Sequence, residues 1–270
     1  MRSFLALFLA LIALGSNKSF AQSNHLVISQ VYGAGGNAGA SYTHDFIEIF
    51  NPTAASVSLV GYSVQYASAT GSSWAVTTLG SGSIPAGGYF LVRLATGGAN
   101  GIALPTPDAT GASNMSGSAG KVALSNSVTA LTGTCPSGVA VVDLLGFGAT
   151  ANCSETAPIS PAGTSAQSMK RTNPCNDTGN NSTEFALATV LGSVRNSATP
   201  ATPCATPPTK LAITSISPAS PTVGANFSVT VQAQDVGNAP QNVIANTNFT
   251  LSVASGNGAI GGTFSGTINA

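Results

Sequence analysis

The residues that could carry acid–base or nucleophilic chemistry are few and scattered along this chain of 270 residues. Its two histidines are His25 and His44, and His44 adjoins Asp45. Neighbours on a strand point to opposite faces, so we interpret His44 as a surface histidine beside a loop. Asp45 and Glu48 are the nearest pair of carboxylates, but their odd spacing also separates them across an ideal strand. With no G-x-S-x-G motif present, the sequence predicts no catalytic residue.

One loop, residues 176–184 (NDTGNNSTE), is rich in oxygen ligands. Asp177, Asn181 and Glu184 are its weak candidates for a structural calcium ion, because calcium prefers carboxylate and amide oxygens. The D-x-[DN]-x-[DN]-G-x5-E spacing of a calcium loop is absent, however. We therefore favour an Asx-rich turn without a metal, and we predict no cofactor.

The four cysteines could form disulfides or bind zinc. No C-x-x-C pair occurs, and both histidines lie far from the cysteines in sequence, which argues against zinc. Three disulfide pairings are possible. We favour Cys135–Cys153 with Cys175–Cys204, because this pairing closes the shortest loops, and the other two stay open.

Charged residues also occur inside runs that predict strands. Asp143 lies within VAVVDLLGFG, and no partner for it is identifiable. Because an isolated buried charge is costly, we expect Asp143 to cap backbone groups or to face outward. Lys170-Arg171 is the only adjacent basic pair, and a solvated strand edge accounts for it.

Short apolar runs bounded by Gly, Asn and Pro predict strands along most of the chain. Residues 26–32 and 45–50 are the first two, and they flank a glycine-rich loop. A strand followed by G-x-G invites a dinucleotide-binding interpretation, but that fold requires a helix next, and here a second strand follows. Further strands are expected at residues 57–59, 62–66, 74–79, 90–94, 121–125, 139–148, 168–172 and 185–189.

This ordered set of segments resembles the bacterial lamin-tail domain. The resemblance rests on VISQVYGAGGNAG, THDFIEIFNPTAASVSLVGYSVQYAS, SIPAGGYFLVRLA, VVDLLGFG and MKRTNPCNDTGNNSTEFALA, and it covers about residues 26–200. It implies an immunoglobulin-like β-sandwich without catalytic residues. It also implies an extracellular setting, because such bacterial domains occur in secreted and surface proteins, sometimes beside nucleases or phosphoesterases.

Composition agrees with an all-β extracellular protein. Only 6% of residues are charged, against about a quarter in typical soluble proteins. Residues 1–21 have the pattern of a secretory signal peptide, with Arg2, an apolar stretch FLALFLALIAL and small residues before a predicted cleavage after Ala21. Cleavage would also remove Lys18 and leave 6 basic and 8 acidic side chains, a formal net charge of −2. No basic surface for nucleic acid and no membrane span is expected in the mature chain.

The chain past residue 200 has a different character. Residues 201–210 include a proline-rich stretch and are expected to be a linker between a lamin-tail-like domain at 22–200 and a second domain at 211–270. Alternating apolar residues there predict four strands, similar to the first part of a bacterial immunoglobulin-like repeat of adhesins. We expect this second domain to be incomplete, because a sandwich of this kind needs about seven strands.

Two functions remain compatible with these observations. The first is a non-catalytic secreted or cell-surface module for binding, adhesion or structure, whose partner would be an extracellular protein or polysaccharide. Its loops at residues 33–44 and 97–120 would present the variable surface. The alternative is the N-terminal accessory region of a larger secreted hydrolase, a nuclease or phosphoesterase, whose catalytic domain lies outside this chain.

Overall fold

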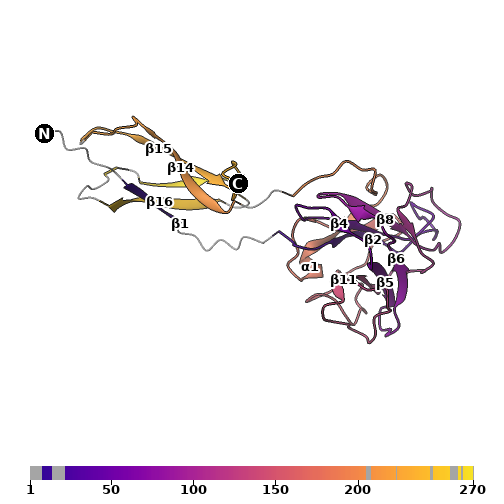
Figure 1. The fold of residues 1–270 in the computed structure, drawn as a ribbon. Coiled ribbons are helices and arrows are strands. Elements are labelled where there is room, and N and C mark those ends of the chain that lie inside the picture. Colours follow the sequence, from indigo (N-terminus) through magenta and orange to yellow (C-terminus); the bar gives the residue numbers. More distant parts are fainter. Residues whose placement is uncertain are drawn as a thin grey trace. The chain divides into compact units, whose positions relative to one another are not determined.

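The computed structural model describes residues 8–13, 22–204, 208–222, 224–243, 246–255, 261–262 and 264–269, and of residues 8–13 and 253–255 it describes the backbone only. The chain forms two compact units (Figure 1). The first runs from Gln22 to Cys204, and the second contains the described residues on either side of it. All candidate functional residues of the sequence lie in the first unit.

The first unit consists of short strands and a single helical turn, as its turn-forming and β-branched residues predict. Its elements are β2 (Val27–Tyr32), β3 (Phe46–Phe50), β4 (Val57–Ser58), β5 (Ser63–Ser68), β6 (Ala75–Thr78), β7 (Ser83–Ile84), β8 (Tyr89–Arg93), β9 (Ala109–Thr110), β10 (Gly120–Ser125), β11 (Val141–Phe147), β12 (Gln167–Arg171), α1 (Asn181–Glu184) and β13 (Phe185–Thr189). Among the described residues, no helix has the length and apolar character to cross a bilayer. The predicted all-β class is confirmed.

Two sheets pack face to face as a sandwich. The larger has the order β13-β12-β2-β3-β8-β9, and the smaller has the order β11-β10-β5-β6. The strands pair antiparallel except β9, which joins β8 in parallel. Ile47 and Ile49 of β3 meet Val122 and Leu124 of β10 in one buried cluster, because alternate residues of each strand face the other sheet. This cluster is the core of the unit.

The outer face of the larger sheet is also covered, by residues 190–204, here called the tail strap. Val190 packs in a cluster with Phe46 of the central strand β3. On the same face, the Glu48 carboxylate is fully buried, and its Oε1 lies 2.6 Å from Nη2 of Arg195 in the tail strap. An apolar contact and an ion pair therefore fix the tail strap to the sheet.

Residues 126–140, here called the loop strap, cover the outer face of the smaller sheet. Trp74, predicted to serve packing, is buried in a cluster with Ala123 and Leu144. Its ring nitrogen donates a hydrogen bond of 3.0 Å to the carbonyl of Gly133 in the loop strap. The indole ring thus packs in an apolar cluster while its only polar group, the ring N–H, is hydrogen-bonded.

A buried lysine lies on the same outer face. The Lys121 side chain of β10 is fully buried, and its ammonium donates to the carbonyls of Gly71 and Thr134 and to the side-chain oxygen of Asn152 at 2.7–2.8 Å. It also lies 5.5 Å from the centre of the Trp74 ring. Burial lowers the pKa of Lys121 because no carboxylate among these contacts offsets the loss of hydration. One charged group thus binds three separate loops.

The two loops expected to present a variable surface are packed against each other and against the sandwich. Asp45 joins them, since its carboxylate accepts hydrogen bonds from the backbone N–H of Gly35 at 2.8 Å and of Met115 at 2.7 Å. A side chain at Gly35 would collide with the backbone of His44, so only glycine allows these two segments to lie this close. The segment 97–120, expected to be one long loop, also contains β9 and the buried side chain of Met115.

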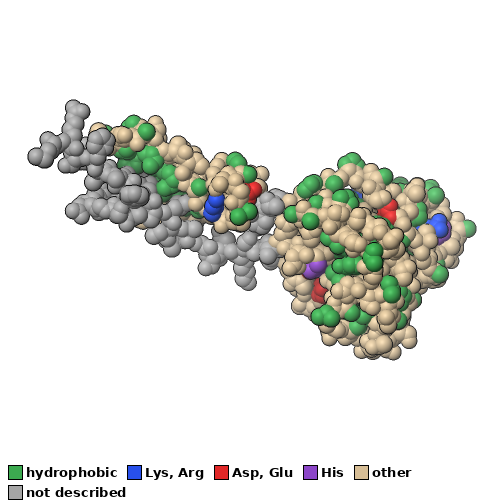
Figure 2. Space-filling model, viewed as in Figure 1, with side chains coloured by type: hydrophobic (Ala, Val, Ile, Leu, Met, Phe, Trp, Pro, Cys, Tyr) green, Lys and Arg blue, Asp and Glu red, His purple; other side chains and the backbone are tan. Residues whose placement is uncertain are grey.

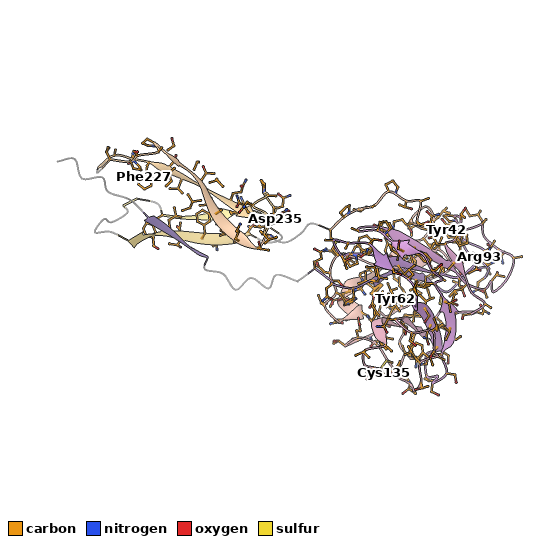
Figure 3. All side chains as sticks on the ribbon, viewed as in Figure 1. Tyr42, Tyr62, Arg93, Cys135, Phe227 and Asp235 are labelled. Atoms are coloured by element: carbon orange, nitrogen blue, oxygen red, sulfur yellow. A yellow bond between two sulfur atoms is a disulfide. The ribbon has the colours of Figure 1, made fainter. Side chains whose placement is uncertain are left out.

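The second unit contains β1 (Phe8–Ala13), β14 (Lys210–Ser217), β15 (Ser228–Gln234), β16 (Thr247–Ser255) and β17 (Ser265–Ile268). Strand β14 pairs with β15, and β16 lies between β1 and β17. Phe227 and Asp235 flank β15 (Figure 3), along which half-buried and exposed residues largely alternate as predicted. Strand β1 lies within the apolar stretch assigned to the signal peptide. The predicted cleavage site after Ala21 and part of the predicted linker, residues 205–207, lie outside the described residues.

We predict that Lys121→Met lowers the free energy of unfolding by about 3 kcal/mol, because the oxygens of Gly71, Thr134 and Asn152 lose their charged donor. The matched control is Lys170→Met, since Lys170 is only half-buried and its ammonium group forms no hydrogen bond with the described residues. This control should change stability by less than about 1 kcal/mol. Urea unfolding of both variants measures the difference, and equal losses would contradict the assigned role of Lys121.

Candidate functional site

A buried arginine links the two sheets through the interior of the sandwich. Nη2 of Arg171, from β12 in the larger sheet, lies 2.8 Å from Oδ2 of Asp143, from β11 in the smaller sheet. Both side chains are fully buried. Nη1 of Arg171 lies 2.6 Å from Oε2 of Glu184, and Nε donates to the carbonyl of Ile28 at 3.0 Å. The guanidinium also lies 4.7 Å from the ring centre of Phe185, its partner across the strand pair.

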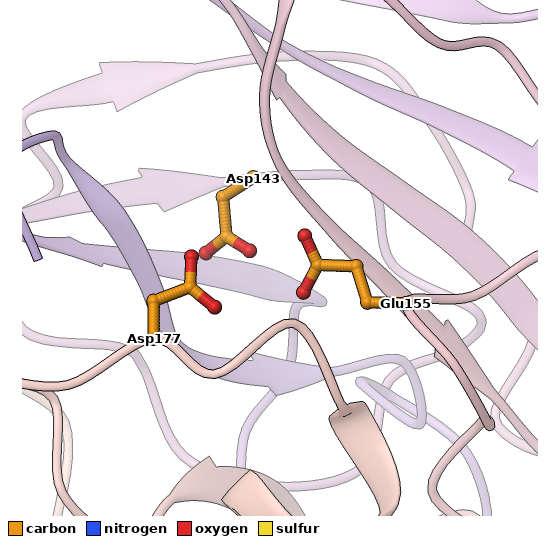
Figure 4. A group of neighbouring side chains, drawn as sticks. All are labelled: Asp143, Glu155 and Asp177. Carbon is orange, nitrogen blue, oxygen red and sulfur yellow. The ribbon is translucent and has the colours of Figure 1, made fainter. Parts of the chain in front are cut away.

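Three carboxylates gather on one side of this ion pair. Asp143, Glu155 and Asp177 each place an oxygen within 4.8 Å of the other two, and their carboxylate groups point toward one another (Figure 4). They come from a strand and from two loops that are separated in sequence. Oδ2 of Asp143 accepts from the backbone N–H of Ile28 at 2.6 Å, whereas its buried Oδ1 has no hydrogen-bond partner among the described residues. We call these three residues the carboxylate triad.

The short helix α1 holds one member of the triad in place. Oδ1 of Asn181 accepts from the backbone N–H groups of Gly146 and Glu155, and its Nδ2 donates to the carbonyl of Leu144 and to Oε2 of Glu155. Asn181 is fully buried, so these bonds satisfy its amide group without water. The helical turn therefore fixes the loop that carries Glu155 to the end of β11.

The electrostatics of the site are dominated by burial and by repulsion among like charges. Burial raises the pKa of Glu155 to about 8, and repulsion from Asp143 and Asp177 adds to this effect. Burial also raises the pKa of Asp143, although the Arg171 guanidinium opposes the shift. Nε2 of His25 lies 3.4 Å from Oδ2 of Asp177 at the outer side of the cluster. The site is thus rich in negative charge, with one permanently positive side chain.

The structure corrects two expectations about these residues. Asp143 does cap a backbone group, but it is buried rather than outward-facing, and its partner is Arg171. Arg171 is also fully buried, so Lys170-Arg171 is not a solvated edge. Arg171 lies two residues after the core residue Met169 on β12, so the two side chains share the inward face of the strand. This spacing is the sequence signal for the inward position of Arg171. No sequence pattern pointed to Glu155.

The weak calcium candidates of the sequence lie in different environments. Asp177 belongs to the carboxylate triad. Glu184, in contrast, binds Arg171 and accepts a hydrogen bond from the backbone N–H of Thr178, and the amide of Asn181 is engaged as described. The predicted set of Asp177, Asn181 and Glu184 therefore does not form one cation site as a group.

The other acid–base candidates lie apart. His44 is half-buried, and its Nδ1 lies 2.7 Å from the Thr43 hydroxyl. Burial lowers the pKa of His44, and the nearby positive charge of Arg93 lowers it further. Asp45 binds backbone groups of two loops, whereas Glu48 binds Arg195 under the tail strap. The two carboxylates thus have separate partners, as their spacing implies.

All four cysteines form disulfides in the favoured pairing. The Cα atoms of Cys135 and Cys153 lie 5.0 Å apart, and those of Cys175 and Cys204 lie 5.6 Å apart. The first bond fixes the loop strap, and the second fixes the end of the tail strap beside β2, β3 and β8. With every cysteine oxidised, the thiolate ligands that a zinc site would use are absent.

Comparison with known proteins assigns a family to the first unit. The family model of the Lamin Tail Domain matches residues 19–147. The chain contains a lamin tail domain. This family has a non-catalytic, immunoglobulin-like fold, in agreement with the observed sandwich. No curated protein and no solved structure matches the chain.

The match to the lamin tail domain ends at Phe147, the last residue of β11, although the sandwich continues to Cys204. The resemblance seen in the sequence extended further, to about residue 200. Strands β12 and β13 complete the larger sheet beyond the match. Asp143 lies inside the matched region, whereas Glu155, Arg171 and Asp177 lie beyond it. The candidate site therefore joins the matched part of the lamin tail domain to the segment that follows it.

We predict that Arg171→Met lowers the free energy of unfolding by about 3–5 kcal/mol, because Asp143 and Glu184 lose their buried counter-charge. Arg93→Met is the matched control, since Arg93 is half-buried at the end of β8 and forms no ion pair within the described residues. It should cost less than about 1 kcal/mol. Denaturant unfolding of both variants tests this, and a small loss in Arg171→Met would show that the inter-sheet ion pair is dispensable.

A pH-dependent prediction follows from Asp45. Burial raises its pKa to about 6, although hydrogen bonds from Gly35 and Met115 oppose the shift. The pKa of Asp45 is higher in the folded than in the unfolded chain, so its protonated form stabilises the fold. This contribution to the free energy of unfolding, about 2–3 kcal/mol, is complete below about pH 4 and is lost as pH rises through about 6. Asp45→Asn should be less stable at low pH, because its amide cannot accept both hydrogen bonds, and it should lose this pH-dependent step. Unfolding curves across this range for both chains measure the step, and an unchanged step in Asp45→Asn would exclude Asp45 as its source.

Proposed function

We propose that this chain is a non-catalytic, secreted or cell-surface module that binds an extracellular protein or serves as a structural element beside one. The lamin tail domain supports the non-catalytic role. Two disulfides support an oxidising, extracellular setting, because such bonds persist outside the reducing cytosol. The N-terminal pattern of residues 1–21 supports export.

The observation that carries this proposal is that the charged side chains of the first unit are buried or half-buried. Between Gln22 and Cys204, no Asp, Glu, Lys or Arg side chain is largely exposed, and each is buried or half-buried. Figure 2 shows one face of the first unit on which charged side chains are sparse and separate. The exposed surface is instead formed largely by Ser, Thr, Asn, Gly and Ala.

Such a surface favours recognition by close contact over long-range attraction. Charged surfaces accelerate encounters and make binding sensitive to salt, whereas neutral polar groups act only at hydrogen-bond distance. A nucleic-acid partner would require a basic surface, which the described residues of the first unit lack. The first unit therefore suits a partner with a similarly uncharged contact surface.

Among extracellular partners, a protein fits better than a polysaccharide. Sugar rings commonly pack against exposed aromatic side chains, which offer a large and rigid apolar face. Within residues 22–204, no Phe, Tyr or Trp is largely exposed, and Trp74 is buried beneath the loop strap. Exposed aliphatic residues such as Val60 and Ile102 remain available for protein contacts.

The test uses the labelled, exported chain and intact cells of its source. Untreated cells should retain the chain to a similar extent at about 0.05 M and about 0.5 M salt, because no exposed charge is involved. Mild protease treatment of the cells should abolish retention, and removal of surface polysaccharide should not. Retention that survives protease but not polysaccharide removal would contradict the proposal. Turnover of nucleic acid, phosphoester or glycoside substrates by the purified chain would contradict its non-catalytic part.

A further inference from the structure

We propose that the carboxylate triad of Asp143, Glu155 and Asp177 is a binding site for a divalent cation of the hard, oxygen-preferring class, with calcium as the ion that fits best. The inference concerns a site in the fold and is independent of the partner proposed above. It also differs from the calcium set considered in the sequence, which shares only Asp177 with the triad.

The first argument is geometric. Calcium binds oxygen ligands at 2.3–2.6 Å, so two ligands on opposite sides of the ion lie about 5 Å apart, and other pairs lie closer. The three carboxylates place their oxygens within 4.8 Å of one another, which fits a shared ion between them. Asp143 is buried and the other two are half-buried, so water can supply further ligands from the outer side.

The second argument is the unpaired oxygen of Asp143. Its Oδ2 already accepts from Arg171 and from the backbone N–H of Ile28, whereas Oδ1 is buried and finds no hydrogen-bond partner in the part of the chain that the structure describes. Buried carboxylate oxygens in folded proteins almost always have a partner, because leaving one unpaired is costly. The Asp143 carboxylate points toward Glu155 and Asp177 (Figure 4), where a cation would supply the missing partner.

The third argument is charge balance. Arg171 contacts Asp143, Asp177 and Glu184, and Glu155 completes a group of four carboxylates around one guanidinium. With all four ionised, this half-buried group carries a net charge of −3 if His25 is neutral. A divalent cation reduces the excess to −1. Burial is the main cause of the raised pKa of Glu155, and repulsion from Asp143 and Asp177 adds to it.

Arg171 leaves room for a cation because it uses other oxygens. Its shortest contacts are to Oδ2 of Asp143 and Oε2 of Glu184, and neither is the free Oδ1 of Asp143. The Oε2 atom of Glu155 accepts a hydrogen bond from the Asn181 amide, and no donor within the described residues contacts its Oε1. Asp177 places Oδ1 3.6 Å from Nη1 of Arg171, whereas its Oδ2 lies beside Nε2 of His25 at 3.4 Å. Each triad carboxylate therefore keeps an oxygen away from the shortest contacts of the guanidinium.

The ligand set favours calcium over other divalent ions. Magnesium requires near-ideal octahedral geometry at shorter distances and releases water reluctantly, whereas calcium tolerates irregular sets of six to eight oxygens. Zinc prefers nitrogen and sulfur ligands, and every cysteine here is in a disulfide. Extracellular calcium modules bind with dissociation constants of about 10⁻⁴–10⁻³ M, which is the range expected for three carboxylates.

The test measures thermal unfolding of the full chain after treatment with a chelator. Calcium chloride at about 5 mM should raise Tm by a few degrees, because only the folded chain assembles the triad. Magnesium chloride at the same concentration should give a smaller shift, and sodium chloride of equal ionic strength should give none. The absence of a calcium-dependent shift, or an equal shift with sodium chloride, would overturn the proposal.

Two variants locate the site. Glu155→Gln and Asp177→Asn each keep the side-chain shape and remove one ionised ligand, so both should lose most of the calcium-dependent shift. Asp108→Asn is the matched control, because Asp108 is a half-buried carboxylate that caps the backbone of Leu91 and lies outside the triad. It should keep the full shift even if its own Tm is lower. Calcium titration calorimetry gives a second readout that does not depend on baseline stability. A response that persists in both triad variants would place calcium elsewhere and overturn the assignment.

Discussion

The ion pair between Arg171 and Asp143 is the contact on which the first unit depends, because it joins the two sheets through their interior. A charge buried without a partner is far less stable than the same charge in water, so neither residue tolerates the absence of the other. Burial of either charge is therefore stable only where β11 and β12 place the two side chains together. The pair then positions Glu184, and with it the helical turn that holds Glu155.

The same principle acts on both outer faces of the sandwich. Glu48 draws Arg195 and the tail strap onto the larger sheet, and Lys121 draws the loops around Thr134 and Asn152 onto the smaller one. Buried charges have strict geometric requirements, so they specify where an irregular segment must lie more sharply than apolar contact does. The irregular covering segments of this unit are thus specified mainly by polar groups.

The sequence predicted the elements better than it predicted their surroundings. Strands and disulfide pairs followed from apolar runs and loop lengths, which are local properties. The burial of Arg171 and the packing of residues 97–120 did not, because they depend on which segment covers which face. The candidate site shows the same limit. Asp177 stood out in an oxygen-rich loop, whereas Asp143 and Glu155 join it only after the sheets have paired.

The disulfide between Cys175 and Cys204 has a mechanical consequence. Cys204 is the last residue of the first unit, and Cys175 lies beside its first residues, where the N–H of Ser23 donates to the Cys175 carbonyl. Tension applied along the chain at Cys204 passes through the sulfur–sulfur bond directly to Cys175. Residues 176–203 are bypassed and bear no load. The intact disulfide therefore keeps the tail strap, α1, β13 and the segment that carries Asp177 from being extended when the chain is stretched from its ends.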